Sequence, residues 1–270
     1  MLAPCVYMSG FDTIKRETNA ELGCATIWLN RPDKRNALSA EVVNVLSSEL
    51  DSLGTDASIR SVFIRGMGKA FCAGADLAEL QMMQNANYEQ NLASSTALAQ
   101  FFTKLANFPK PTAAIVHGPA LAGGCGLASC CDFVIASSAA TFGYPEVKIG
   151  FIPAIVMVLL THQIGERAAR DLCLSGAPID AATAHHIGLV SRVVEPDKLE
   201  EAALALAGEL AKNSPQAMAT VKAAFWGIHS MSVEAALKHA AELNAKARGS
   251  ADCKEGIAAF LEKRKPKWTS

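Results

Sequence analysis

Short apolar runs alternate with helix-favouring segments along most of the chain. Four of these runs have the length and composition of buried strands: Ala25 to Asn30, Ser61 to Arg65, Thr112 to Val116 and Phe133 to Ala136. Between the first two, Ser39 stands where it would cap a helix whose apolar residues follow helical spacing. Strands that alternate with helices predict an α/β fold.

Towards the C-terminus the pattern becomes almost wholly helical. One last strand is expected at 189–194, after which Pro196 and Asp197 start a run of helices. Apolar residues gather on one helical face over 199–210, and the helical pattern continues over 217–228, 233–247 and 252–265. We therefore expect a core of residues 1–196 and a helical region of residues 197–270. Since so small a helical region buries little apolar surface alone, it should pack on its own chain or on a neighbour.

Composition and charge narrow the class of protein. Half of the 270 residues are apolar, which is enough for a large core. The 25 basic and 26 acidic residues are interspersed and give a net charge of −1. Without a broad basic face, nucleic acid and anionic membranes are not expected partners. No run approaches the 18 apolar residues of a membrane span, and the first residues lack a secretory leader pattern.

Eight cysteines are scattered through apolar segments without paired spacing, and a chain of this size does not need disulfides. This usage indicates a reducing compartment, and we expect a cytoplasmic protein. Cys72, Cys130 and Cys131 lie near the chemistry described below, but no histidine is placed to activate them, so they are expected to be buried filler. His185 and His186 have no acidic or cysteine residues at ligand spacing, so no metal site is expected.

Glycines interrupt the chain at two points where a strand leads into a helix. After Thr112 to Val116, the turns Gly118-Pro119 and Gly123-Gly124 precede a predicted helix start. After the strand at 61–65, a second glycine-containing loop leads to Asp76 near a helix N-terminus. Helix N-termini direct backbone N–H groups at one point and favour negative charge there. We expect two anion-binding loops. The one at Gly123-Gly124 has neither the pattern of a nucleotide phosphate loop nor the length of a dinucleotide-binding fingerprint.

Glu146 lies about twenty residues after the second glycine pair, in an otherwise apolar segment. A backbone anion site beside one half-buried carboxylate suggests enolate chemistry. The alternative is that Glu146 belongs to a structural ion pair with Lys148 or Arg167.

Six motifs together resemble the crotonase superfamily, also called the enoyl-CoA hydratase/isomerase family. They are NRPDKRNALS at 30–39, GKAFCAGADL at 68–77, HGPALAGGCGLASCCD at 117–132, FGYPEVKIGF at 142–151, GLVSRVV at 188–194 and FLEKRK at 260–265. They occur in order over nearly the whole chain. The resemblance implies a spiral of ββα units, followed by a C-terminal helical trimerisation region, and a homotrimer or a dimer of trimers.

The resemblance also implies roles for individual residues. The backbone N–H groups of Ala75 and Gly123 would hold a thioester enolate, and Glu146 would move protons. Coenzyme A would enter as part of the acyl-CoA substrate, and no separate cofactor is expected. Substrate- or CoA-binding positions are implied for Lys34, Arg35, Ala37, Ala73, Gly74, Asp76, Leu77, Gly126, Phe260 and Lys263. The last two match a contact often made to a neighbouring subunit, although Lys263 could equally be ordinary solvated charge.

One position departs from the best-known hydratases of the family, which have a second glutamate where this chain has Gly126. The family's Δ3,Δ2-enoyl-CoA isomerases work with a single glutamate that matches Glu146, so hydratase and isomerase are both open. The segments GGCGLA and FGYPEVKIGFIPA look most like hydratases, including 3-methylglutaconyl-CoA hydratase/dehydratases, which favours hydration. A catalytically silent or RNA-binding homologue is a third alternative, and the near-neutral charge argues against RNA.

Overall fold

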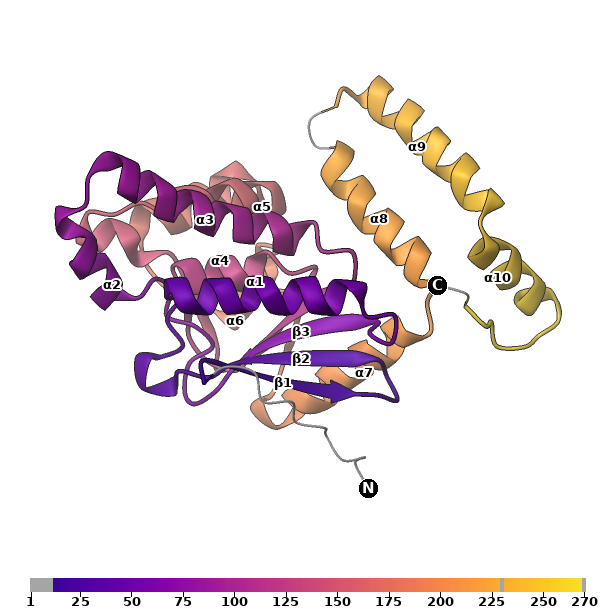
Figure 1. The fold of residues 1–270 in the computed structure, drawn as a ribbon, viewed down its shortest axis with the longest axis horizontal. Helices are drawn as coiled ribbons and strands as arrows, with labels where there is room; N and C mark the ends of the chain where they lie inside the picture. The colour runs from indigo at the N-terminus through magenta and orange to yellow at the C-terminus, as the bar shows by residue number, and fades with distance from the viewer. Residues whose placement is uncertain (1–11, 229–230, 269–270) are drawn as a thin grey trace.

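A six-stranded sheet forms the centre of the protein, in a computed structural model that describes residues 12–228 and 231–268 (Figure 1). The strand order is β1-β2-β3-β4-β6-β9, with β1 antiparallel to β2 and every other neighbouring pair parallel. The strands are β1 (Ile14–Asn19), β2 (Cys24–Leu29), β3 (Ser61–Gly66), β4 (Thr112–Val116), β6 (Phe133–Ser137) and β9 (Arg192–Val194). All five parallel strands coincide with strands predicted from the apolar runs.

The sequence pattern missed β1 and a small second sheet. In β1 only Ile14 is buried, because an edge strand pairs on one side and its polar residues, KRETN, face partly towards solvent. The second sheet has the order β5-β7-β8 and consists of β5 (Ala120–Leu121), β7 (Thr141–Gly143) and β8 (Ile179–Asp180). Strands of two or three residues are too short to show a period of two.

The helices that precede β9 lie on one side of the main sheet (Figure 1). They are α1 (Ala40–Thr55), α2 (Leu77–Met82), α3 (Tyr88–Ala106), α4 (Gly123–Ser129), α5 (Ala154–Ser175) and α6 (Ala181–His186). On this side α1 and α4 contact the strands of the sheet, and α3 and α5 pack on those two helices. Ser39 caps α1 by accepting from Val42 N at 3.2 Å, as the sequence predicted, and Asp180 caps α6 by accepting from Thr183 N at 2.7 Å. α5 bends at Gly165, where φ is 76°.

The other face of the sheet is covered by α7 (Leu199–Ala211). Its buried residues, including Leu199 and Leu206, pack on Phe63, Ile115 and Ile135 from three strands. α7 therefore belongs to the same packed body as the sheet. The division of the chain near residue 197 stays a prediction.

The helices α8 (Pro215–Ile228), α9 (Val233–Gly249) and α10 (Ala251–Leu261), here called the arm, project away from this body (Figure 1). Neither α8 nor α9 has a buried residue, although both carry large apolar side chains. Near the start of the arm, Lys222 Nζ lies 2.7 Å from Asp132 Oδ2 and 3.2 Å from Lys110 O. This ion pair joins α8 to the loops that flank β4 and β6.

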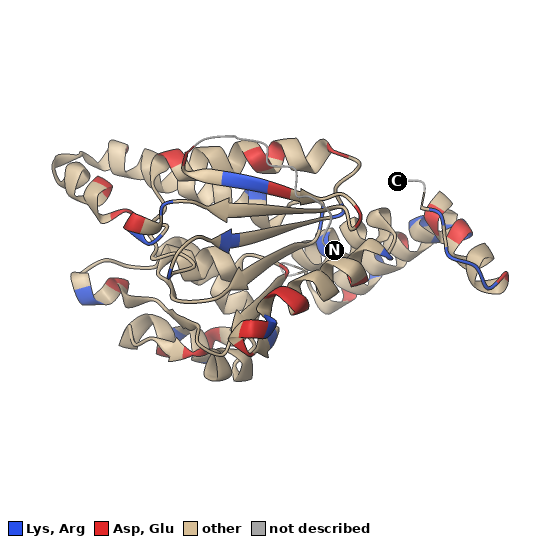
Figure 2. Ribbon diagram, turned by 90° about the horizontal axis from the view of Figure 1, so that it is seen from below, with Lys and Arg blue, Asp and Glu red and all other residues tan. Residues whose placement is uncertain are grey.

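Charges of both signs are interspersed along the ribbon, as the composition indicated (Figure 2). Within residues 12–228 and 231–268, no helix is long and apolar enough to cross a membrane. The same residues contain no group of three or more His, Cys, Asp and Glu that could hold a metal ion. Six cysteines are buried, as expected, and burial raises the pKa of Cys72 to about 12. Cys5 lies outside the described residues.

Candidate active site

The loops that follow β2 and β3 are held together by Asn36. This residue is 1% exposed and has a φ of 57°, a conformation that asparagine tolerates better than most side chains. Its Nδ2 donates to Met67 O at 2.8 Å and to Ala70 O at 2.9 Å, while its Oδ1 accepts from Arg31 N at 2.9 Å. Sequence reasoning did not single out Asn36. The feature that could have pointed to it is an asparagine inside a predicted loop, because the side-chain amide of such a residue can hydrogen-bond the backbone of a neighbouring loop.

The backbone of Leu38 fixes the chain on both sides of Ala75. Leu38 N donates to Gly74 O at 2.7 Å, and Asp76 N donates to Leu38 O at 3.2 Å. The Ala75 N–H donates in none of the hydrogen bonds among the described residues. It is therefore a fixed donor that is available to a ligand.

Asp76 holds this loop to the helix that follows. Its Oδ1 accepts from Ala78 N at 3.0 Å, which caps α2, near whose N-terminus Asp76 was predicted to lie, and its Oδ2 lies 2.9 Å from Arg31 Nη2. Burial would raise the pKa of Asp76, but the Arg31 guanidinium and the Ala78 N–H together hold it below its ordinary value. The carboxylate is thus charged and already bonded within the loop. Leu77, the next residue, is 66% exposed.

The loop before α4 meets this loop backbone to backbone. A Cβ added at Gly74, where φ is 93°, would lie 2.5 Å from the Cβ of Ala122 and 3.1 Å from Gly123 N, so only glycine fits. A Cβ added at Gly123 would lie 3.9 Å from Ala75 N. The structure therefore brings the two predicted amides, of Ala75 and Gly123, to one place.

Ala122 sets the direction of the Gly123 amide. Its φ of 51° and ψ of −130° are rare for a residue with a side chain, and its N–H donates to Gly143 O at 2.8 Å. Gly123 is the first residue of α4, where a backbone N–H has no partner within the helix. The second amide is thus also unengaged among the described hydrogen bonds and lies at the positive end of a helix dipole.

Glu146 comes from the segment that pairs with this loop. β7 runs parallel to β5, with Leu121 opposite Gly143, and Glu146 follows in a short 3₁₀ helix, Pro145–Ile149. The side chain is buried at 8% exposure, and its Oε2 has no hydrogen-bond partner. Burial raises the pKa of Glu146 above its ordinary value.

The described ion pairs do not include Glu146, so the alternative of a structural pair with Lys148 or Arg167 is not borne out. The charge of Glu146 in turn helps to raise the pKa of Cys125 and Cys173, mainly a result of their burial. A buried carboxylate oxygen without a partner is the kind of group that a substrate proton or water satisfies.

Gly126 lies on the buried side of α4, and the space beside it is filled. A Cβ added there would lie 2.2 Å from Val156 Cγ1 and 2.8 Å from Val156 Cβ, at the start of α5. The sequence left open whether a second carboxylate would have room at this position. In the structure, the side chain of Val156 fills the space that such a carboxylate would need.

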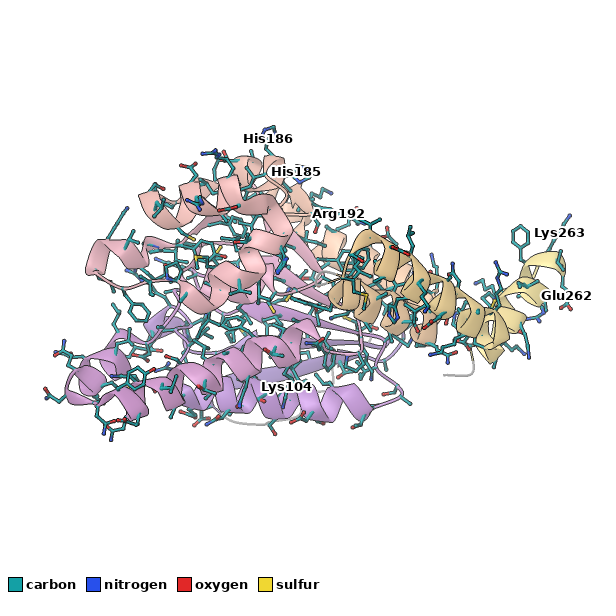
Figure 3. The ribbon with its side chains drawn as sticks, turned by 90° about the horizontal axis from the view of Figure 1, so that it is seen from above. Lys104, His185, His186, Arg192, Glu262 and Lys263 are labelled. Atoms are coloured by element: carbon teal, nitrogen blue, oxygen red, sulfur yellow. The ribbon has the colours of Figure 1, made fainter. Side chains whose placement is uncertain are left out.

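The remaining predicted positions fall into two groups. Lys34 and Arg35 are exposed in the loop after β2, beside Ala37, and Ala73 N donates to Arg35 O at 3.0 Å. This group adjoins the paired amides. Lys263 lies at the far end of the arm, well away from the body of the same chain (Figure 3), and Phe260, which is 83% exposed, stands three residues before it. A single chain does not bring them to the site.

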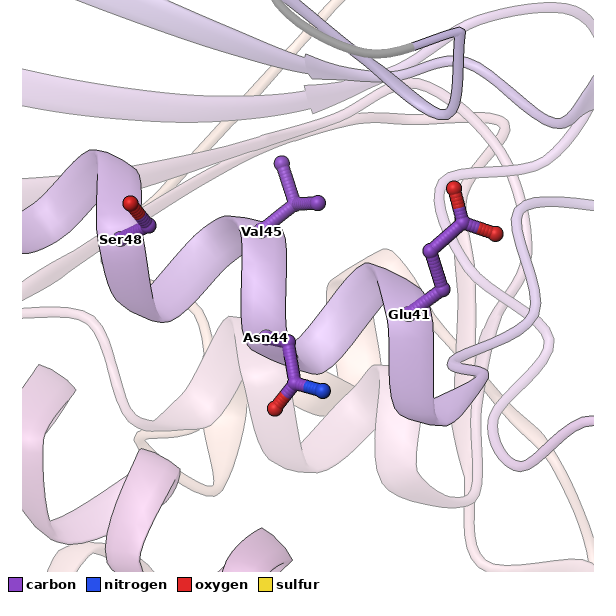
Figure 4. Close-up of a pocket in the computed structure, with 4 residues that line it drawn as sticks. All are labelled: Glu41, Asn44, Val45 and Ser48. Carbon is purple, nitrogen blue, oxygen red and sulfur yellow. The ribbon is translucent and has the colours of Figure 1, made fainter.

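His185 and His186 are exposed on α6, as expected for a solvated face (Figure 3). The pocket drawn in Figure 4 is lined by Glu41, Asn44, Val45 and Ser48, all from α1, and includes none of the predicted site residues. We therefore assign no ligand to it.

A largely parallel sheet with paired glycine loops, a buried carboxylate and a helical arm defines an α/β protein of the crotonase class. Known proteins agree with this class. The sequence profile of the family described as Enoyl-CoA hydratase/isomerase matches residues 19–270. The chain belongs to this family.

Relatives and solved structures cover almost the whole chain. A Thermus thermophilus protein with enoyl-CoA hydratase in its name is 45% identical over 244 residues, which are 90% of this chain and 96% of that protein. The 2,3-dehydroadipyl-CoA hydratase of Escherichia coli is 38% identical over 243 residues, covering 89% and 92%. The crystal structure of an enoyl-CoA hydratase from Mycobacterium smegmatis superposes with a TM-score of 0.90 at 32% identity, covering 96% of this chain and 99% of the other. The predicted fold class is confirmed.

Proposed function

We propose that the protein is an enoyl-CoA hydratase-like enzyme whose Ala75 and Gly123 amides form an oxyanion hole and whose Glu146 transfers the proton. One observation carries this proposal: two unengaged backbone donors converge at one place, and the segment that pairs with their loop carries a buried carboxylate with an unpartnered oxygen. Structural glycine turns would not require a buried, unpaired carboxylate nearby, which costs free energy.

The reaction passes through a state with negative charge on the thioester carbonyl oxygen. Water attacks the β-carbon of the α,β-unsaturated acyl group, and the electron pair of the double bond moves onto that oxygen. Glu146 accepts a proton from the attacking water and returns it to the α-carbon as the enolate collapses. Backbone amides suit the developing charge because they are fixed in place and do not take up a proton.

In this scheme a single carboxylate performs both proton transfers. Val156 supports this point, because it occupies the space beside Gly126 that a second glutamate would need. The same observation favours the alternative function, a Δ3,Δ2-enoyl-CoA isomerase, in which one carboxylate moves a proton between two carbons and no water is added. The names of the relatives favour hydration. A silent or RNA-binding homologue is disfavoured by the near-neutral charge and by the buried Glu146.

Coenzyme A is proposed to enter with the substrate, against the loop of Lys34, Arg35, Ala37 and Ala73, without a separate cofactor. Since Phe260 and Lys263 lie far from this loop in one chain, their proposed contact is to the CoA of a neighbouring subunit in a homotrimer or dimer of trimers. A cytoplasmic location remains part of the proposal. Hydration of 3-methylglutaconyl-CoA is the narrower proposal that follows from the sequence resemblance.

A panel of thioesters tests the activity and separates its alternatives. Crotonyl-CoA and 2-hexenoyl-CoA report simple hydration, a 3-enoyl-CoA reports isomerisation, and 3-methylglutaconyl-CoA reports the narrower substrate. 2,3-Dehydroadipyl-CoA has the same chain length as 2-hexenoyl-CoA and adds only a terminal carboxylate. Hydrated products, separated by chromatography, are expected from at least one 2-enoyl thioester. Turnover of the 3-enoyl thioester alone would identify an isomerase, and no turnover of any would refute both.

Gly123→Ala tests the oxyanion hole directly. The added methyl has room, because its nearest neighbour, Leu38 Cδ1, lies at 3.6 Å. However, the methyl also lies 3.9 Å from Ala75 N, close to the position that the oxyanion would occupy. Turnover should fall by about 10²-fold or more, while the melting temperature stays near that of the wild type. Gly208→Ala is the matched control, because it lies in α7 with no atom within 4 Å of the added methyl. Wild-type turnover in Gly123→Ala would contradict the assignment.

A further inference from the structure

Among the residues that the structure describes, Tyr144 is the largest fully buried side chain, and it stands two residues before Glu146. Its hydroxyl oxygen lies 3.4 Å from Ser129 Oγ. Ser129 is the last residue of α4, the helix whose first residue, Gly123, supplies a proposed oxyanion donor. The Tyr144 hydroxyl therefore links the segment that carries the proton-transfer group to the helix that carries an anion donor.

The direction of this contact follows from its neighbours. Ser129 Oγ donates its proton to Gly126 O at 3.0 Å, which leaves the Ser129 oxygen free to accept from Tyr144. Burial raises the pKa of Tyr144 well above its ordinary value, so the hydroxyl keeps its proton at any working pH. Tyr144 thus acts as a neutral donor and takes no part in proton transfer.

The same segment is also tied to the other end of α4. Gly143 O accepts from Ala122 N at 2.8 Å, one residue before the helix begins. Two consecutive residues, Gly143 and Tyr144, therefore contact the start and the end of α4. Two ties along one helix fix both the position and the direction of the segment that continues to Glu146, whereas one would leave it free to pivot.

We infer that Tyr144 is a positioning residue, whose hydroxyl holds the Glu146 segment in register with the Gly123 amide through Ser129. This inference rests on the proposed function, because the register matters only if both groups act on one substrate. A proton-transfer group that is slightly misplaced loses rate more than binding, since its alignment is needed chiefly in the transition state.

Tyr144→Phe tests the inference, because it removes one oxygen and keeps the ring in its place. On the best thioester of the panel, kcat should fall about three- to tenfold, the range for one neutral hydrogen bond, with KM within about twofold of the wild type. Tyr88→Phe is the matched control, since it removes the same hydroxyl from a side chain that is 74% exposed. It should leave kcat unchanged.

Ser129→Ala removes the acceptor and separates positioning from packing. If the two hydroxyls act through one contact, Ser129→Ala should lower kcat by a similar factor, and the double variant should be no slower than the slower single variant. The acid limb of the kcat profile should also move in Tyr144→Phe, because the surroundings of the carboxylate change. Wild-type kcat and an unmoved profile in Tyr144→Phe, or multiplicative losses in the double variant, would overturn the inference. An inactive wild type would refute the proposed function instead.

Discussion

At the scale of the residue, the site depends on one carboxylate kept in an unfavourable state. Glu146 is buried with an oxygen that has no partner, and burial raises its pKa above the ordinary value of 4.5. A raised pKa brings a carboxylate closer to the pH at which proton transfer in both directions is efficient. Burying this carboxylate without a partner lowers the free energy of unfolding of the protein.

Glu146→Gln should show both sides of this arrangement. The amide keeps the volume but cannot accept a proton, so kcat should fall by roughly 10²- to 10⁴-fold while acyl-CoA affinity changes little. Steady-state rates and direct binding of a saturated acyl-CoA measure the two effects. Wild-type turnover on every thioester would show that Glu146 is not the proton-transfer group.

The pH dependence has a definite sign in each assay. The ionised form accepts the proton, so kcat of the wild type should fall as pH drops through the raised pKa. Stability moves the other way, because a carboxyl group with a raised pKa contributes stability below its ordinary value and loses it as pH rises through the raised value. Glu146→Gln should therefore melt at a higher temperature than the wild type at neutral pH, with the difference disappearing below about pH 4.5.

The neighbouring position, Gly126, is where a second carboxylate is excluded by packing. Gly126→Ala should destabilise the protein by roughly 1–3 kcal/mol, because its Cβ would lie 2.2 Å from Val156 Cγ1. Adding Val156→Ala removes that carbon and should restore part of the loss. Urea denaturation measures both. Equal stability of Gly126→Ala and the wild type would show that α5 moves aside easily, and that a second glutamate could be accommodated.

At the scale of the element, one partly buried ion pair sets how the arm leaves the body. Lys222 is 9% exposed, its Nζ lies 2.7 Å from Asp132 Oδ2, and the same oxygen accepts from Thr112 N at 2.7 Å. The carboxylate therefore fixes the start of β4 and the middle of α8 at once. β4 leads to the loop of Gly118 to Gly124, so the arm and the site share this strand.

Lys222→Met should loosen the arm and leave an uncompensated carboxylate at Asp132. A loss of roughly 1.5–3 kcal/mol in the free energy of unfolding is expected for a hydrogen-bonded charged group, together with faster proteolysis within residues 211–215. Lys104→Met is the matched control, since Lys104 Nζ lies 2.7 Å from Asp51 Oδ2 but joins α3 to α1, within the body (Figure 3). That more exposed pair should contribute at most about 1 kcal/mol. Equal effects of the two variants would argue against an anchoring role.

At the scale of the whole molecule, the arm exposes more apolar surface than is usual for a monomeric soluble protein. Its exposed large apolar residues are Val221, Phe225, Met231, Val233, Leu237, Ile257, Phe260 and Leu261. Such a surface is typical of protein–protein interfaces. We expect it to be covered by neighbouring copies of the same chain.

Light scattering after size exclusion should therefore give the mass of a trimer or a dimer of trimers of the 28.4 kDa chain. Phe225→Glu places a charge on an α8 side chain that is 62% exposed in one chain. It should shift the protein towards smaller species without unfolding the body. A stable, active monomer at micromolar concentration would contradict the proposed assembly and the contact of Phe260 and Lys263 with a neighbour's CoA.

The parallel strands, the helix caps and the glycine loops can be predicted from the amino-acid sequence alone. Apolar runs such as Thr112 to Val116 are buried on both faces of a sheet, and such burial leaves a continuous signal in the chain. Ser39 and Asp180 act on backbone groups three residues away, so their roles are local and readable. The candidate loops could likewise be predicted, because a close approach of two backbones requires glycine and so leaves glycines in the sequence.

The surroundings of those loops depend on how distant segments pack together in the folded protein. The closure of the space beside Gly126 by Val156 depends on how α5 crosses α4, and the bond of Tyr144 with Ser129 depends on how β7 lies along α4. The edge strand β1 owes its form to pairing with β2 rather than to its own polar sequence. Contacts between segments distant in the chain leave no periodic pattern in either segment. Each such contact depends on the shapes of two side chains that come together only in the folded protein.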